Sequence, residues 1–75
     1  MNGDRLVKRS LTIAGHRTSI ALEPEFWAAL EALAGKRGLR LATLIEEIDR
    51  DRTGPNLSSA LRVAVLRDAQ SHPEV

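Results

Sequence analysis

The apolar and polar residues near the start of the chain alternate one by one, a period typical of a β-strand with one face in a core. The alternation runs from Val7 to Leu22 and is broken at Gly15-His16. Because a two-residue loop with glycine first suits a type II′ turn, we expect a β-hairpin with its loop at this dipeptide. This loop predicts the facing pairs Ala14 with Arg17, Ile13 with Thr18, Thr12 with Ser19, Leu11 with Ile20, and Ser10 with Ala21.

The two faces of the predicted hairpin differ in character. Residues expected to face a core are Leu11, Ile13, Thr18, Ile20 and Leu22. The opposite face carries small, polar and basic side chains: Lys8, Ser10, Thr12, Ala14, Arg17, Ser19 and Ala21. A slip of one residue would exchange the two sets, so the alternation itself predicts which side chains point outward.

Three helices are predicted after the hairpin, from apolar residues spaced three and four apart. The first spans about residues 24–37, because Pro24 suits a first helical position and a glycine follows the end. A second begins near Leu41 and ends before Thr53-Gly54-Pro55. The third is capped by Asn56 and runs to about Gln70.

The third helix and the short chain together predict self-association. The apolar residues of this helix cover a face too wide for packing on one side only: Leu57, Leu61, Val63, Ala64, Val65 and Leu66. A monomer of 75 residues buries only about 60% of its unfolded surface, and the chain has no cysteine for a disulfide. We therefore expect a single domain over residues 1–75, flexible at 1–6 and 71–75, that forms a homodimer.

Charge is distributed unevenly along the chain, although the net charge is only +1. Residues 1–22 contain four basic residues and one acidic residue, whereas residues 23–52 contain five basic and seven acidic residues. Basic residues in a segment with so little acid are typical of contact with nucleic-acid phosphates. The alternative interpretation of the same side chains is an ordinary solvated sheet face.

Neither catalysis nor metal binding is indicated by the side chains that could support them. Glu46, Glu47 and Asp49 lie on the outer side of the second predicted helix, flanked by arginines, and are interpreted as solvated surface. His16 falls in the predicted turn and has no second ligand nearby in sequence. With no secretory signal and no apolar run of about 20 residues, we expect a cytoplasmic, non-enzymatic protein without a cofactor and without a membrane partner.

The segment Arg17–Trp27 (RTSIALEPEFW) and the segment Ala32–Leu39 (ALAGKRGL) resemble the strand, first helix and turn of ribbon-helix-helix proteins, the superfamily of the Arc and MetJ repressors. The resemblance covers roughly half of the chain. It implies an α+β, mostly helical fold in which strands of two chains pair into an antiparallel ribbon that enters the major groove, above interlocked helices. It also implies that Arg17, Ser19 and Ala21 point at DNA, while Thr18, Ile20 and Leu22 point into the core.

Two features depart from the pattern of this family. The strand around Arg9–Ala14 precedes the family's own strand, and it could flank the ribbon or replace its pairing. At the start of the second helix, family members often place a small polar residue whose backbone amide holds a phosphate, but this chain has Arg40–Thr43 (RLAT). A second alignment places that helix start at Asn56–Arg62, where a polar cap and free amides suit a phosphate, and makes residues 39–52 an inserted helix.

Pattern and resemblance together predict a dimeric, sequence-specific transcriptional regulator, of repressor type, whose partner is double-stranded DNA. Arg17 would read guanine, Ser19 would donate or accept a hydrogen bond, and Ala21 would contact a thymine methyl group. The full set of expected contact residues is Arg17, Ser19, Ala21, Lys8, Arg9, Ser10 and Thr12. Dimers could assemble further on DNA. The alternative is a protein-interaction module of antitoxin or adaptor type, in which the same dimer holds a protein partner through its acidic helix face or third helix.

Overall fold

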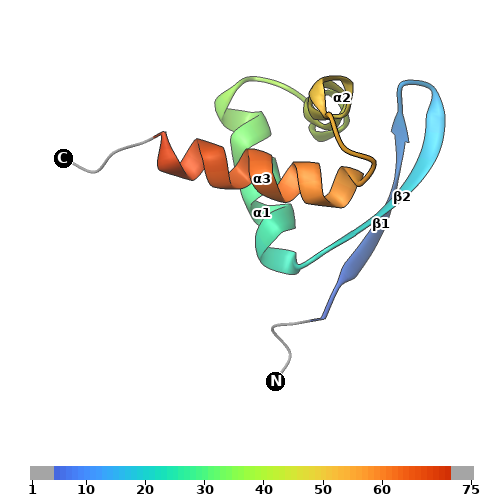
Figure 1. Cartoon of the computed structure of the whole chain (residues 1–75), viewed down its shortest axis with the longest axis horizontal. Coiled ribbons are helices and arrows are strands. Elements are labelled where there is room, and N and C mark those ends of the chain that lie inside the picture. The colour runs from blue at the N-terminus through green and yellow to red at the C-terminus, as the bar shows by residue number, and fades with distance from the viewer. Residues whose placement is uncertain (1–4, 72–75) are drawn as a thin grey trace.

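The computed structural model of the chain describes residues 5–71, so most of the ends expected to be flexible lie outside the described residues. Two strands, β1 (Val7–Ile13) and β2 (His16–Leu22), precede three helices, α1 (Pro24–Lys36), α2 (Leu41–Asp51) and α3 (Leu57–Gln70). The strands form one antiparallel hairpin that curves along one side of the helices, and α3 crosses α1 (Figure 1). The predicted α+β order and all three helices are confirmed.

The hairpin closes one residue earlier than predicted. Its loop consists of Ala14 and Gly15, whose φ angles of 52° and 84° are both positive, as a type I′ turn requires. Ile13 therefore pairs with His16, and the pairing continues to Val7 opposite Leu22. The predicted loop and facing pairs were wrong because a lone glycine suits the first position of a type II′ loop and the second position of a type I′ loop equally well.

The shift leaves the two faces of the hairpin unchanged, because it moves each facing pair by two residues and side chains alternate with a period of two. Ile13, Ile20 and Leu22 are buried, and Leu11 and Thr18 are half-buried. The predicted assignment of these residues to the core side is confirmed. The alternation of the sequence thus specified the faces but could not specify the register.

The turn offers a test of this register. Ala14 has a backbone conformation that L-residues adopt at a cost of about 1–2 kcal/mol and that asparagine tolerates better. We expect Ala14→Asn to raise the free energy of unfolding by about 0.5–1 kcal/mol, measured by urea denaturation. Gly15→Ala should lower it by about 1–2 kcal/mol, although a Cβ there would meet no atom within 4 Å. A lower free energy of unfolding for Ala14→Asn, or a higher one for Gly15→Ala, would contradict the observed loop.

One hydrophobic core lies between the hairpin and the helices, and every element contributes to it. Its members are Ile13, Ile20, Leu22, Trp27, Leu30, Leu33, Ala34, Leu44, Ile45 and Leu61. Among them, five side chains have no exposed surface at all: Leu22, Leu30, Leu44, Ile45 and Leu61. The core is therefore closed by residues of a single chain.

Ion pairs at the periphery hold α3 against α1. Arg62 on α3 contacts Glu23 at 3.0 Å, and Lys36 contacts Asp68 at 3.0 Å. A hydrogen bond from its own backbone amide, followed by the hydrogen bond from Arg62, lowers the pKa of Glu23 below its ordinary value. These hydrogen bonds therefore favour the ionised form of Glu23, which pairs with Arg62 on α3.

The wide apolar face of α3 is only partly covered within the chain. Leu61 is fully buried, whereas Val63 is 39% exposed and Leu66 is 54% exposed. The homodimer that this face led us to expect stays a prediction. In residues 5–71 no helix combines the length and the apolar character needed to cross a membrane.

Candidate nucleic-acid interface

The outward side of the hairpin brings six of the seven predicted contact residues together. It consists of Lys8, Ser10, Thr12, Arg17, Ser19 and Ala21, which we call the polar hairpin face. Thr12 faces Arg17, Ser10 faces Ser19, and Lys8 faces Ala21 across the two strands. All of these residues are exposed except Ala21, which is half-buried.

The facing pairs of the polar hairpin face lie close together. In a hairpin with a two-residue loop, the pair next to the loop is hydrogen-bonded, so the pairs one step further are the closely spaced, non-hydrogen-bonded ones. Accordingly, the Oγ atoms of Ser10 and Ser19 are 3.3 Å apart. Small hydroxyl side chains therefore occupy the middle of the face, with Lys8 toward one end and Arg17 toward the other. From Lys8 to Thr12 the strand advances about 13 Å.

Lys8 and Arg17 supply the charge of this face. Neither side chain forms an ion pair or a hydrogen bond with another residue in the part of the chain that the structure describes. The face contains no acidic residue. It therefore presents two uncompensated cations beside a row of small hydrogen-bonding groups, an arrangement suited to the phosphates and base edges of a nucleic acid.

Arg9 does not join the polar hairpin face, although it was among the predicted contact residues. It faces Ile20 in the register and therefore points to the helix side. Its guanidinium lies 2.7 Å from a carboxylate oxygen of Glu31 and 4.7 Å from the ring centroid of Trp27. The prediction grouped Arg9 with Lys8 by charge alone. Arg9 lies two residues before the core-facing Leu11, so the strand alternation places both side chains on the same face.

The start of α3 lies beside β2. A hollow of about 430 Å³ is lined by Thr18–Ile20 on one side and Pro55–Ser58 on the other, and the Ser58 hydroxyl donates to the carbonyl oxygen of Ala21 at 3.5 Å. As predicted, Asn56 caps α3, its Oδ1 accepting from the Ser59 amide at 3.1 Å. The start of α2 has no side-chain cap. Of the two helix starts considered from the sequence, the one at Asn56 therefore borders the family's strand.

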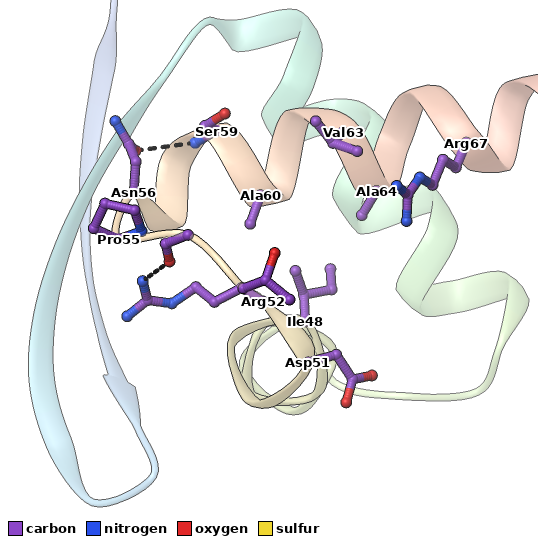
Figure 2. A pocket seen from close by; sticks show the side chains of 12 residues that line it. Ile48, Asp51, Arg52, Pro55, Asn56, Ser59, Ala60, Val63, Ala64 and Arg67 are labelled. Atoms are coloured by element: carbon purple, nitrogen blue, oxygen red, sulfur yellow. Dashed lines mark hydrogen bonds between the residues drawn. The ribbon is translucent and has the colours of Figure 1, made fainter.

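A larger hollow of about 610 Å³ lies away from the polar hairpin face, between the end of α2 and α3 (Figure 2). Ile48, Ala60, Val63 and Ala64 provide its apolar lining. Arg52 lies at the start of the segment that connects α2 to α3, where its Nη1 donates to the Gly54 carbonyl oxygen at 2.6 Å (Figure 2). Within residues 5–71 there is no group of three or more side chains able to hold a metal ion. The geometry of this hollow supplies no arrangement of nucleophile and base.

Comparison with protein families identifies the fold. The model of the ribbon-helix-helix domain matches residues 6–69, so the chain belongs to the ribbon-helix-helix family. Domains of this family are regulatory, DNA-binding or antitoxin folds and not enzymes. The matched region includes β1, all of α2 and α3 up to residue 69, so the additional strand and all three helices are part of the matched domain.

A solved structure shares this fold. It is that of an uncharacterized protein from Bordetella pertussis Tohama I, which is 35% identical to this chain and superimposes with a TM-score of 0.74. The similarity covers 92% of this chain but only 59% of the other, so this chain spans less than two thirds of that protein's length. No curated protein matches the chain.

Proposed function

We propose that the protein is a sequence-specific DNA-binding transcriptional regulator that reads the major groove with its polar hairpin face. The observation that carries the proposal is the exposed, acid-free surface on which Lys8 and Arg17, two cations unpaired within residues 5–71, flank small hydroxyl groups. The major groove of B-DNA is about 12 Å wide and admits a two-stranded β-ribbon. Membership of a family of DNA-binding regulators supports the same conclusion.

Each residue of the face has a distinct proposed role. Arg17, with its planar fork of donors, would bind two acceptors on a guanine edge. Lys8, a compact point charge, would contact phosphate. Ser10, Thr12 and Ser19 would donate to or accept from base edges or phosphates, and Ala21 offers only a methyl contact. Arg9 is omitted because Glu31 and Trp27 already hold its side chain on the opposite face.

The proposed working form is a cytoplasmic homodimer that binds two half-sites related by two-fold symmetry and acts as a repressor. Proteins of this family generally bind DNA as dimers. Dimers could assemble further on adjacent half-sites.

Fluorescence anisotropy of a labelled mixed-sequence duplex at about 50 and 200 mM salt tests the proposal, because phosphate-driven binding weakens steeply over that range. We expect wild-type protein to bind at the lower salt and to lose affinity at the higher. The Lys8→Ala/Arg17→Ala variant should bind more weakly and with a shallower salt dependence. Arg50→Ala removes an exposed cation from α2 and serves as the matched control, with near-wild-type binding expected.

Absence of wild-type binding at both salt concentrations would reject the proposal. A protein-interaction module of antitoxin or adaptor type is the second hypothesis, and the low net charge of +1 is the observation that favours it. It would be supported by a stoichiometric complex with a protein partner together with no salt-sensitive DNA binding.

A further inference from the structure

We propose that Glu46, on α2, is a positioning residue for DNA reading: it holds the tip of the hairpin, and through the tip it sets the direction of Arg17. Glu46 itself would not touch DNA. This role rests on the proposed function of the polar hairpin face, to which it adds a residue from a different element. The contact lies within one protomer, so each subunit of the proposed homodimer would contain it.

A charge-assisted hydrogen bond connects the tip of the hairpin to α2. The backbone amide of Ala14 donates to a carboxylate oxygen of Glu46 at 2.8 Å. Hydrogen bonds to an ionised acceptor are roughly twice as strong as those between neutral groups. The strand pairing ends at Ile13 opposite His16, so the Ala14 amide is not part of it. Because Ala14 also has a positive φ of 52°, the bond stabilises the turn in a conformation that alanine alone disfavours.

The residues at the tip have little burial to hold them. Ile13, at 4% exposed, is the last buried side chain before the loop, whereas Ala14, Gly15 and His16 are exposed. Two-stranded ribbons also vary in twist more than larger sheets do. Without the bond to Glu46, the packing of Ile13 would be the nearest restraint on the twist of the tip.

Arg17 lies close enough to the tip to depend on this restraint. It is the second residue after Gly15 and faces Thr12, and the two form the pair of the polar hairpin face nearest the loop. An arginine that reads a guanine edge needs two aligned hydrogen bonds, whose geometry must be held within about 0.5 Å. A change in the twist of the tip would disturb that alignment, whereas the attraction to phosphates would remain. We therefore expect Glu46 to affect discrimination between bases more than overall attraction to DNA.

The charge of Glu46 acts on DNA binding in the opposite direction. A carboxylate near a DNA-binding surface repels the phosphates and lowers the affinity for every sequence. Glu46→Gln removes this charge but keeps a side-chain oxygen that can accept from the Ala14 amide. Glu46→Ala removes both the charge and the acceptor, and alanine, the best helix former, preserves α2. The two variants thus separate the positioning effect from the charge effect.

DNA discrimination by variants of α2 tests the positioning role. Fluorescence anisotropy at about 50 mM salt is recorded on the duplex that wild-type protein selects from random sequences and on its single-base variants. Wild type, Glu46→Ala and Glu46→Gln are compared, after circular dichroism has shown that each is folded. Glu47→Ala is the matched control, because it removes a neighbouring carboxylate whose contact is Arg37, at 3.3 Å.

We expect Glu46→Ala to lose about threefold or more of the discrimination at one base position, out of the about 5- to 150-fold that a base pair contributes. Glu46→Gln and Glu47→Ala should keep the wild-type discrimination within about twofold. Unchanged discrimination by Glu46→Ala, or an affinity loss that is equal for all sequences, would overturn the inference. An equal loss in Glu46→Gln or in Glu47→Ala would make the effect one of charge and would reject it as well. If wild-type protein binds no duplex, the proposed function fails, and the positioning role fails with it.

A second measurement follows the hydrogen bond without DNA. Amide hydrogen exchange of ¹⁵N-labelled protein is recorded by NMR for wild type and the two Glu46 variants. We expect the Ala14 amide to exchange about tenfold or more faster in Glu46→Ala, with shifts in the signals of Thr12 and Arg17, and to stay close to wild type in Glu46→Gln. Equal exchange in wild type and Glu46→Ala would show that Glu46 does not hold the tip, and the inference would be wrong.

Discussion

Leu61→Ala should lower the free energy of unfolding by about 2–5 kcal/mol, because it removes a large side chain from a site too closely packed to collapse fully. Leu66→Ala, the same substitution on the same helix, should change it by less than about 0.5 kcal/mol. Leu61 has no exposed surface, whereas Leu66 is 54% exposed. Since small domains are stable by only about 5–15 kcal/mol, the first loss is a large part of the total. Urea denaturation followed by circular dichroism measures both.

The same pair of variants tests whether the single chain closes its own core. If a partner subunit covers the outer side of α3, Leu66→Ala should also be costly, and the unfolding midpoint should rise with protein concentration. Similar losses for the two variants would contradict a core closed within one chain. A large loss for Leu61→Ala alone, independent of concentration, would agree with the buried cluster that α3 shares with the hairpin and the other helices, and it would contradict a homodimer formed through the outer side of α3.

The helices could be predicted closely because their signals are local. Pro24 starts α1, and Asn56 caps α3 through its own side chain, as the sequence indicated. The apolar spacing of α2 likewise predicted a helix that starts at Leu41. In each case a few neighbouring residues specify the element, so no knowledge of distant contacts was needed.

The position of the hairpin loop was missed because the residues around the turn were compatible with two positions. Both loop positions kept the same alternation, so hydrophobic pattern could not separate them. In the structure the amide of Ala14 is bound by Glu46, which lies on α2. That contact joins parts of the chain far apart in sequence, and it was not visible in the residues around the turn.

In the candidate site, too, local pattern predicted some of the residues correctly, whereas others depend on how distant parts of the chain pack. Six of its predicted residues share the polar hairpin face because strand alternation placed them there. Arg9 was added for its charge, and the structure pairs it with Glu31 on the helix side. The approach of Pro55–Ser58 to β2 depends on how α3 packs, which the sequence pattern left open between two helix starts.

Arg17→Ala should weaken DNA binding by about 1–3 kcal/mol, which is about 5- to 150-fold, and should relax specificity at one base position in each half-site. Arg17 is exposed, unpaired within residues 5–71, and lies on the acid-free side of the hairpin. The measurement is anisotropy on a duplex selected from random sequences and on a panel of its single-base variants. Arg9→Ala is the matched control, because it removes the same charge from the opposite side of the same hairpin.

Arg9→Ala should leave DNA affinity within about twofold and lower stability slightly, since exposed ion pairs contribute only about 0–1 kcal/mol. Arg17→Lys separates base reading from phosphate attraction: a lysine retains the charge but lacks the two-pronged donor geometry that matches a guanine edge. If Arg17 reads a base, Arg17→Lys should keep the salt dependence of binding yet lose discrimination at the same position as Arg17→Ala. Full discrimination by Arg17→Lys would instead make Arg17 a phosphate contact, and equal losses for Arg9→Ala and Arg17→Ala would remove the polar hairpin face from the DNA interface.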